Sequence, residues 1–295
     1  MKRREFAGKS VLGAVALSAV PYFGISQTPG AAPRSNRKGI MWGNIGYGTT
    51  ILEKFQAAKA AGFDGVEVVS HLNRDEVLKA SEMTGLPVPS VYGKYSLTDP
   101  DEKVRALAVE ALKVTIEDAK IYGGDTILLV PGRVNENVSY DVCWDRSVSG
   151  IKAALPFAEK MGISIAIENV WNNFLLSPLE AARYIDQFNS PLVRSYFDCG
   201  NVLVIGWPEQ WIRILGKRIA RIHIKEYSRK IADKQGKWAG FGVALQEGDN
   251  NWPVIVKALD EIGYKSWATI EQPGGDNPEG LKELCNRLTN ILAIQ

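Results

Sequence analysis

An alternation of short apolar runs with longer amphipathic segments, repeated eight times from Gly39 onward, most constrains the fold of this chain. The short runs are rich in β-branched residues and predict buried strands, whereas the longer segments predict helices. Eight strand–helix units within residues 39–295 have the size and pattern of a single (β/α)₈ TIM barrel, an α/β fold. An open doubly wound sheet is the main alternative, but no Gly-x-Gly-x-x-Gly motif follows the first strand.

The boundaries of these units follow from β-branched runs, glycine stops and helix-capping residues. The predicted strands cover residues 39–42, 65–69, 88–92, 126–130, 163–167, 193–197, 219–224 and 267–270. Helices are predicted over residues 51–61, 74–84, 99–122, 139–161, 208–215, 252–262 and 278–292, and another begins at Ser177. The third strand is weak because proline cannot donate a hydrogen bond to a sheet.

The start of the chain has the features of an export signal. The basic sequence Lys2-Arg3-Arg4 precedes an apolar stretch over residues 11–25, which Pro21 interrupts. That stretch is too short for a good membrane span and fits the apolar core of a signal peptide. The arginine pair followed by Glu-Phe resembles a twin-arginine signal. We therefore expect an exported, periplasmic protein with no membrane span after removal of the signal.

These features divide the chain into three parts. Residues 1–29 are the predicted signal peptide, residues 30–38 a linker and residues 39–295 the barrel. The whole chain has a net charge of +2. Because the predicted signal is itself basic, the barrel is close to neutral, which argues against a nucleic-acid partner. Three cysteines without a Cys-x-x-Cys spacing argue against a disulfide framework, and we interpret Cys199 as a packed core residue.

The ends of the last four predicted strands carry the residues with the strongest chemical signal. Each strand end bears one side chain that can bind a metal ion, namely Glu168, Asp198, His223 or Glu271. The carboxyl ends of barrel strands meet at one mouth, so we expect these four residues to form one site. Three carboxylates and an imidazole suit one divalent ion, with Mn²⁺, Mg²⁺ or Co²⁺ favoured over Zn²⁺. Taken singly, a carboxylate at a strand end is more often a helix cap or an ion-pair partner than a metal ligand.

Several motifs then resemble a known family. The sequences IENV, FDCGN and IHIKE, and the stretch 247–272, resemble the sugar phosphate isomerase/epimerase group of xylose isomerase-like TIM barrels. That group includes ketose 3-epimerases, hydroxypyruvate isomerases and inosose dehydratases. The resemblance implies that Glu168, Asp198, His223 and Glu271 are the metal ligands. It also implies that Glu168 and Glu271 act as acid and base on opposite faces of a sugar, and that Arg229 holds substrate oxygens.

Two positions depart from the pattern of the ketose 3-epimerases. Asn201 stands where those enzymes tend to have histidine, and Phe174 stands where a polar substrate-binding group can sit. The departures leave the metal ligands intact but leave the reaction open.

Further substrate-binding candidates lie near the strand ends. Lys225 is two residues after His223 and shares its strand face. The remaining candidates are His71, Asn201, Trp171 and Trp42, for which a structural role is the alternative. Glu67 lies within a strand and could support a metal ligand. The polar, glycine-rich segment 228–250 is either a lid over the site or a mobile surface insert.

These residues predict an enzyme that acts on a small-molecule sugar. A metal-dependent isomerase or epimerase would remove the proton beside a ketone to give an enediolate. A lyase or dehydratase would expel a β-substituent from the same intermediate. A third alternative is a non-catalytic, metal-dependent sugar-binding barrel. Export favours a free ketose, a 3-keto sugar or a 3-keto glycoside over a sugar phosphate. Barrels of this kind often pair, so a homodimer is also open.

Overall fold

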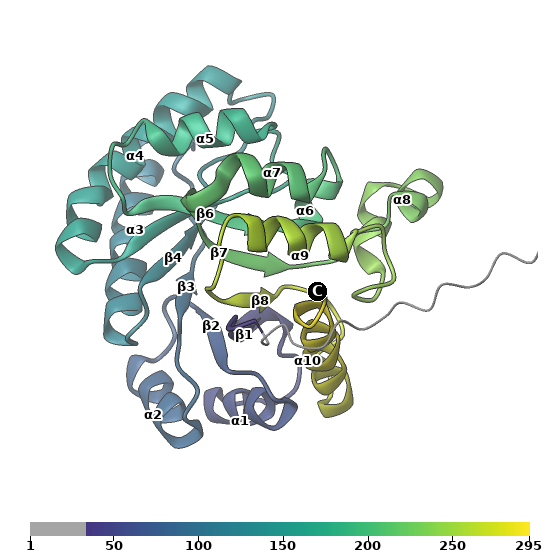
Figure 1. The fold of residues 1–295 in the computed structure, drawn as a ribbon. Helices are drawn as coiled ribbons and strands as arrows, with labels where there is room; N and C mark the ends of the chain where they lie inside the picture. Colours follow the sequence, from purple (N-terminus) through teal and green to yellow (C-terminus); the bar gives the residue numbers. More distant parts are fainter. Residues whose placement is uncertain (1–33) are drawn as a thin grey trace, which may run out of the picture. The chain divides into compact units, whose positions relative to one another are not determined.

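The computed structural model describes residues 34–295, in which eight parallel strands close into a barrel (Figure 1). Neighbouring strands in the sequence are neighbours in the barrel, and β1 closes it by pairing with β8. This pairing confirms the predicted (β/α)₈ barrel and excludes an open sheet. The strands are β1 (Lys38–Met41), β2 (Gly65–Val69), β3 (Ser90–Tyr92), β4 (Thr126–Leu129), β5 (Ser164–Glu168), β6 (Val193–Asp198), β7 (Ile219–Ile224) and β8 (Ala268–Ile270).

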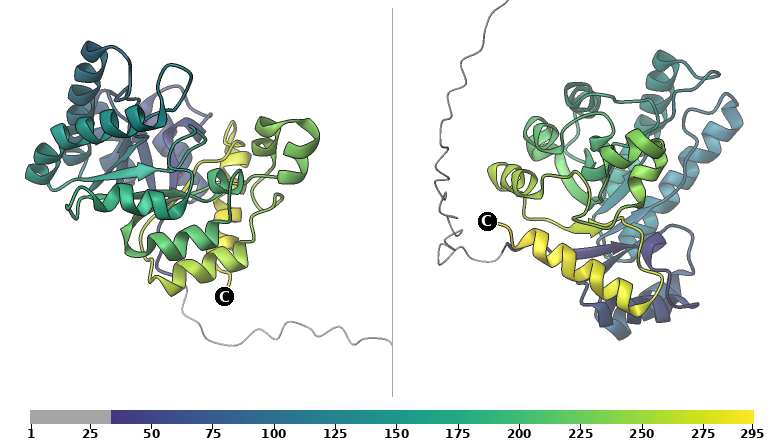
Figure 2. Two further views of the ribbon diagram at one scale, coloured as in Figure 1. Left: turned by 90° about the horizontal axis from the view of Figure 1, so that it is seen from above. Right: turned by 90° about the vertical axis from the view of Figure 1, so that its right-hand side faces the viewer.

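Helices surround the strands in all three ribbon views (Figures 1 and 2). They are α1 (Ile51–Ala61), α2 (Arg74–Thr84), α3 (Glu102–Ile121), α4 (Tyr140–Met161), α5 (Pro178–Asp186), α6 (Cys199–Leu203), α7 (Pro208–Leu215), α8 (Arg229–Gln235), α9 (Trp252–Glu261) and α10 (Pro278–Leu292). Short 3₁₀ helices are η1 (Trp42–Asn44), η2 (Gly216–Arg218) and η3 (Lys237–Gly242). The helix α8 stands out from this ring of helices.

Most predicted boundaries differ from the structure by no more than a few residues. The helix α3 begins three residues later than predicted because Asp101 caps it through the backbone N–H of Lys103. The strand β3 is shorter than predicted and begins after Pro89. Five helices were not predicted. The 3₁₀ helices η1 and η2 are short, and α6 begins after Asp198, which is its cap; α8 and η3 lie within the segment predicted to be a lid or mobile insert.

The core has two layers, as expected for a barrel whose strands are covered by helices. The larger layer packs the outward faces of the strands against the helices. A small cluster fills the barrel interior and consists of Leu128, Ala166, Tyr196 and Ala220. The interior also contains polar residues, because Glu67 on β2 and Ser90 on β3 are fully buried. These two residues form a polar floor beneath the barrel mouth.

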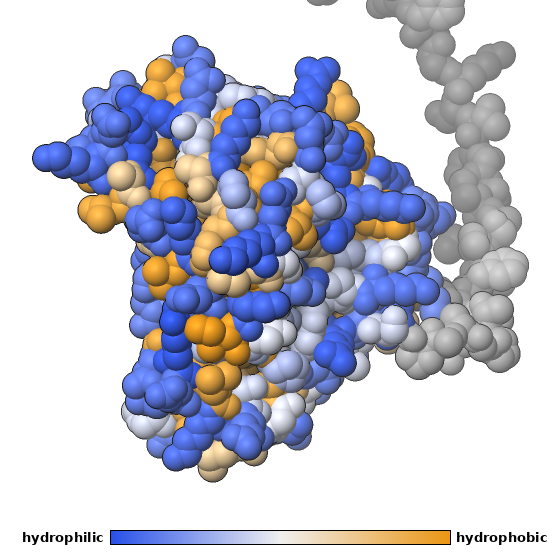
Figure 3. Space-filling view, turned by 90° about the vertical axis from the view of Figure 1, so that its left-hand side faces the viewer, coloured by the Kyte–Doolittle hydropathy of each residue, from blue (hydrophilic) through white to orange (hydrophobic). Residues whose placement is uncertain are grey.

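The described part of the predicted linker contacts the barrel. Asn36 donates a hydrogen bond to the carbonyl of Ser266 before β8, and Arg34 donates one to Asp260 in α9. The predicted signal peptide lies outside the described residues. Within residues 34–295, the structure has no helix with the length and apolar composition needed to cross a bilayer. On the side of the barrel drawn in Figure 3, hydrophilic residues predominate and apolar side chains are scattered among them.

The start of α1 gives a test of the fold. The Thr50 hydroxyl accepts a hydrogen bond from the Glu53 N–H, and the Glu53 carboxylate accepts bonds from Thr49 and Thr50 that lower its pKa to about 2. Thr50→Ala removes the hydroxyl and should lower the free energy of unfolding by about 1 kcal/mol, measured by urea denaturation. Thr50→Ser keeps the hydroxyl and should retain most of that stability. Equal losses in both variants would contradict this interpretation of the cap.

Candidate metal centre

Strand register brings the four predicted ligands together at the barrel mouth. Glu168 is the last residue of β5, Asp198 is the last residue of β6, and Glu271 directly follows β8. His223 on β7 pairs with Asp198 on one side and with Thr269 on the other. Since the strands are parallel, their carboxyl ends lie at one edge of the barrel, and the four side chains meet there.

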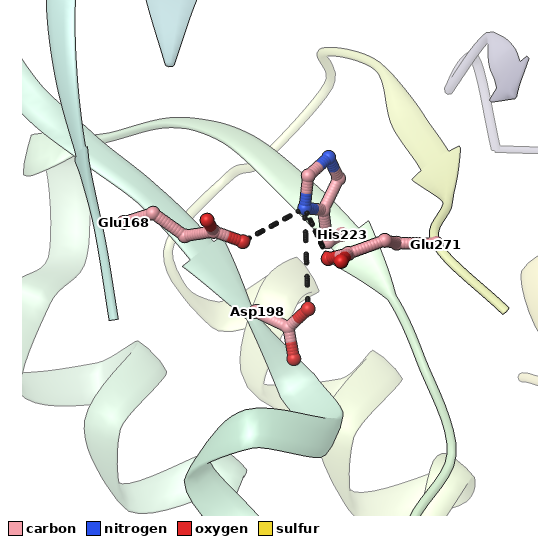
Figure 4. Close-up of side chains that lie close together, drawn as sticks. All are labelled: Glu168, Asp198, His223 and Glu271. Carbon is pink, nitrogen blue, oxygen red and sulfur yellow. Dashed lines mark hydrogen bonds and ion pairs between the residues drawn. The ribbon is translucent and has the colours of Figure 1, made fainter. Parts of the chain in front are cut away.

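The four side chains point toward one another in Figure 4, and the marked contacts converge on the Nδ1 atom of His223. Each residue offers one ligand atom, and all four atoms lie within 4.8 Å of one another. His223 Nδ1 is 3.0 Å from Glu168 Oε1, 3.0 Å from Glu271 Oε2 and 3.9 Å from Asp198 Oδ2. A nitrogen that carries at most one hydrogen therefore faces three carboxylates.

This donor set fits a divalent cation. Asp198 Oδ2 and Glu271 Oε2 are buried, and neither accepts a hydrogen bond within the described residues. Buried carboxylate oxygens that accept no hydrogen bond are costly, whereas a cation between them would satisfy both. Carboxylate oxygens and a neutral imidazole are also the ligands that Mn²⁺ and related ions accept. The cluster of Glu168, Asp198, His223 and Glu271 could therefore hold one metal ion.

The second nitrogen of His223 is held from inside the barrel. His223 Nε2 lies 3.0 Å from Glu67 Oε1, and both side chains are fully buried. Glu67 is in turn held by the hydroxyl of Ser90, 2.6 Å away, and by the hydroxyl of Tyr196. A carboxylate on the remote nitrogen fixes the tautomer and ring orientation of a metal-binding histidine. Nδ1 is thereby left to face the carboxylates at the mouth.

Burial and neighbouring charges shift the titration of the cluster. Burial raises the pKa of Asp198 well above its ordinary value and raises that of Glu168, to which Glu271 adds a further increase. Burial would lower the pKa of His223, but Glu67, Tyr196, Glu168 and Glu271 together outweigh burial, and the pKa is raised. Burial would raise the pKa of Glu271, but Lys225 and His223 together outweigh burial, and the pKa is lowered. Protons therefore compete with a metal ion for these side chains.

Two asparagines connect the tips of β5 and β6. The Asn169 side chain donates to the Asp198 carbonyl at 2.9 Å and accepts from the Asp198 N–H at 3.0 Å. Asn201 donates through its amide to the Asn169 carbonyl, and its backbone N–H donates to Asp198 Oδ1. These bonds fix the Asp198 side chain and leave Oδ2 directed at the cluster. Asn201, a predicted substrate-binding residue, is buried and has an unpaired Oδ1 within the described residues.

Lys225 lies next to the cluster, as its spacing from His223 predicts. Its Nζ atom is 2.9 Å from Glu271 Oε1 and 3.8 Å from Asp198 Oδ2. Burial would lower the pKa of Lys225, but the carboxylates of Asp198, Glu271 and Glu168 raise it overall. The side chain therefore stays an ammonium and can hold a negatively polarised oxygen beside the carboxylates.

Arg229 and His71, two other predicted substrate-binding residues, have different surroundings. The Arg229 guanidinium donates to the carbonyls of Leu203 and Gly206 and lies over the Trp207 ring. Through these contacts, the Arg229 side chain joins α8 to the end of α6 and to the loop that follows it. His71 follows β2 with a left-handed φ of 67°, and its side chain is exposed. Substrate contact by either residue stays a prediction.

The aromatic candidates also differ in their surroundings. Trp42 begins η1 and packs against Phe55 of α1, with Lys54 Nζ over its ring. Trp171 in the β5–α5 loop is 37% exposed and contacts Trp238 of η3. Phe174 is buried among aromatic residues that include Tyr140 and Trp144. Its ring fills a core position, so no polar group acts there.

Some residues of the centre were absent from the sequence prediction. Tyr196 lies two residues before Asp198 on the same strand and so shares its face, a period-two signal that could have placed it at the site. Ser90 and Asn169 gave no comparable signal, because their roles depend on contacts between different strands. The predicted packing role of Cys199 agrees with its complete burial.

The segment after β7 is folded onto the barrel. The carboxylate of Glu226, directly after Lys225, accepts hydrogen bonds from the backbone of Gln246 and Asn250 and from the Trp252 indole. Gln272, after Glu271, donates to the Val243 carbonyl. This segment therefore has several fixed contacts at the barrel mouth, whereas a role as a closing lid stays a prediction.

Comparison with known proteins identifies the family. The family model described as "Xylose isomerase-like TIM barrel" matches residues 55–291. This chain belongs to that family. The resemblance predicted from the sequence motifs is thus confirmed. Among curated relatives, inosose dehydratase from Geobacillus thermodenitrificans (strain NG80-2) is 24% identical, over 72% of this chain and 78% of the relative. L-ribulose-5-phosphate 3-epimerase UlaE from Escherichia coli (strain K12) is 28% identical, over 76% and 85%.

Solved structures show the same fold. The apo form of 3-keto-D-glucoside 4-epimerase, YcjR, from E. coli superposes with a TM-score of 0.73 at 19% identity and covers 87% of this chain and 98% of its own. An L-ribulose 3-epimerase superposes with a TM-score of 0.74 at 17% identity, over 87% and 94%. At these identities the likeness establishes the barrel fold alone.

The contact between Glu67 and His223 gives a test of the centre. Glu67→Gln removes the charge that orients and strengthens the imidazole as a ligand, so the affinity for Mn²⁺ should fall about 10- to 100-fold. Isothermal titration calorimetry measures the change. Glu110→Gln on α3 is the control, because Glu110 is exposed and pairs with Lys113. An unchanged affinity in the Glu67 variant would show that Glu67 does not support the metal ligand.

Proposed function

We propose that this protein is a divalent-metal-dependent sugar epimerase or isomerase that acts on a ketose or keto-sugar through an enediolate. The observation that carries the proposal is the convergence of three carboxylates on His223 Nδ1, where two of their buried oxygen atoms accept no hydrogen bond within the described residues. The relative named L-ribulose-5-phosphate 3-epimerase supports this reaction class. The favoured ion is Mn²⁺, Mg²⁺ or Co²⁺, and Zn²⁺ is a further candidate.

Glu168, Asp198, His223 and Glu271 would hold the ion. When bound there, it supplies a Lewis acid that stabilises negative charge developing on the substrate's ketone oxygen. Glu168 and Glu271 project from β5 and from the end of β8, on different sides of His223 Nδ1 (Figure 4). One of these carboxylates removes the proton beside the carbonyl, and the other returns a proton from the opposite face. Inversion of a carbon needs both residues, whereas isomerisation uses one face.

The neighbouring residues position the substrate and the acid–base groups. Lys225 Nζ lies against Glu271 and Asp198 and holds a substrate oxygen at the same end of the cluster. Asn169 and Asn201 keep the tips of β5 and β6 in place. Glu67 prevents rotation of the His223 ring. The barrel interior beneath the cluster is filled by side chains, so the substrate enters from the mouth.

A lyase is the second candidate function. It would use the same proton abstraction and then expel a β-substituent from the enediolate. The relative named inosose dehydratase favours this candidate. Analysis of the product distinguishes the two reactions, because elimination releases the substituent and epimerisation retains it. A non-catalytic sugar-binding barrel is the third candidate, and it predicts binding without exchange of any substrate hydrogen.

Proton exchange tests the proposed reaction. The Mg²⁺-loaded protein should incorporate deuterium beside the carbonyl of a ketose or 3-keto glycoside in D₂O, observed by NMR. Glu168→Gln and Glu271→Gln should each lower the rate of substrate turnover about 100-fold or more, because each removes an acid–base group. Metal content is measured for every variant, and Glu110→Gln is the control. Normal turnover by the Glu271 variant would refute its role. Absence of exchange across a broad panel, in protein that binds metal and sugar, would favour the binding barrel.

We also propose that the protein is exported to the periplasm by a twin-arginine-type signal, and that its substrate is therefore not phosphorylated. The Arg3-Arg4 pair and the apolar stretch support this proposal. Replacing both arginines with lysine should leave the protein unprocessed in the cytoplasm, as cell fractionation would show, while Lys9→Arg should be exported normally. Export of the double variant would exclude the twin-arginine route. The homodimer stays a prediction, which light scattering can test.

A further inference from the structure

Three aromatic side chains gather beside the metal centre, and we call them the mouth aromatic group. Trp171 lies in the β5–α5 loop, and Trp238 and Phe241 lie in η3. The ring centroids of Trp171 and Trp238 are 4.4 Å apart at an interplanar angle of 78°. The Phe241 ring is 6.4 Å from Trp171 and 6.3 Å from Trp238. Both segments follow the carboxyl ends of strands, so the group lies at the mouth of the barrel.

Lys225 connects this group to the proposed reaction site. Its Nζ atom is 2.9 Å from Glu271 Oε1 and 5.6 Å from the centroid of the Phe241 ring. Trp171 is three residues after Glu168 along the chain. The Lys225 side chain thus lies between the mouth aromatic group and the carboxylate of Glu271. A sugar bound at the cluster would therefore lie close to these rings.

The exposure of the two tryptophans indicates a surface available to a ligand. Trp238 is 57% exposed and Trp171 is 37% exposed, although the two rings are in contact. Aromatic side chains that line a polar site commonly bind the apolar faces of ligand rings. Sugar rings present such faces through their C–H groups. A structural role, in which η3 packs onto the β5–α5 loop, also explains the contact between the tryptophans. Such packing would stabilise the fold more if both rings were buried.

The segment that carries Trp238 and Phe241 is held in a fixed position. Gly240 allows η3 to approach the barrel, because a Cβ atom there would lie 2.6 Å from the Tyr227 ring and 2.8 Å from the Ser228 carbonyl. The Tyr227 and Phe241 ring centroids are 4.6 Å apart. Glu226 accepts hydrogen bonds from both Gln246 and Asn250, beyond η3. The aromatic surface is therefore formed before any ligand binds.

We propose that the mouth aromatic group is a subsite for a ring-shaped aglycone, and that the substrate is a keto-glycoside rather than a free ketose. This inference rests on the proposed function, because it places the reacting sugar at the cluster. The reacting ring lies against Glu168, Glu271 and Lys225. The second ring, joined through the glycosidic oxygen, stacks on Trp171 and Trp238.

Binding of glycosides that cannot react tests the subsite apart from turnover. The probes are phenyl D-glucopyranoside and methyl D-glucopyranoside of the same anomeric form, which lack a ketone and so cannot form an enediolate. Calorimetry with the Mg²⁺-loaded protein should show that the phenyl glycoside binds about three- to tenfold more tightly than the methyl glycoside, the range of an aromatic contact. Trp171→Ala and Trp238→Ala should each reduce this preference.

Two further variants serve as controls. Trp171→Phe keeps an aromatic ring and should retain most of the preference, whereas a purely structural role would make the phenylalanine and alanine variants alike in binding. Leu107→Ala on α3 truncates a side chain that is 70% exposed elsewhere on the barrel and should leave both affinities unchanged. Equal affinity for the two glycosides, no measurable binding of either, or a preference that survives both alanine variants would overturn the subsite.

The two proposals fail separately. Deuterium exchange with keto-sugars in a protein without the phenyl preference would overturn the subsite and leave the reaction. Suppose instead that the protein prefers the phenyl glycoside through its tryptophans but exchanges no deuterium. That result would overturn the proposed reaction, and with it the identification of the substrate as a keto-glycoside.

Discussion

The contact of one buried imidazole with carboxylates on both sides determines the arrangement of the rest of the site. His223 Nε2 faces Glu67 in the barrel interior, and Nδ1 faces Glu168 and Glu271 at the mouth. The ring cannot turn without breaking the inner contact, so Glu67, held by the hydroxyls of Ser90 and Tyr196, sets the direction of the outer nitrogen. A carboxylate inside the barrel would be costly without these partners.

The closed barrel makes such a site possible from residues far apart in the sequence. Glu67 on β2 and His223 on β7 are 156 residues apart, yet their side chains meet inside the barrel. The mouth adds a second level of organisation. Lys225 and Glu226 are consecutive, but Lys225 points to the metal ligands, whereas Glu226 fixes the segment that carries Trp238 and Phe241. A short stretch after β7 therefore couples the chemistry of the cluster to the shape of its surroundings.

The sequence was sufficient to predict the barrel and the four converging residues, because both depend on local periodicity and on the rule that parallel strand ends share one edge. The sequence indicated that Glu67 could support a metal ligand, but its pairing with His223 required the register of the closed barrel, which no local pattern encodes. The aromatic packing of Phe174 depends on helices α4 and α5, and the carbonyl contacts of Arg229 depend on the α6–α7 loop. The helices α8 and η3 were missed because their segment is polar, glycine-rich and without a clear helical period.

The most direct test of the account is X-ray diffraction from Mn²⁺-loaded crystals, with anomalous data collected near the manganese edge. We expect one strong anomalous peak at the barrel mouth, bonded to Glu168, Asp198, Glu271 and the Nδ1 atom of His223. We also expect that Nε2 of the same ring remains bonded to Glu67. A metal ion held through Nε2, an ion bound elsewhere, or protein that binds no manganese at this cluster would contradict the account.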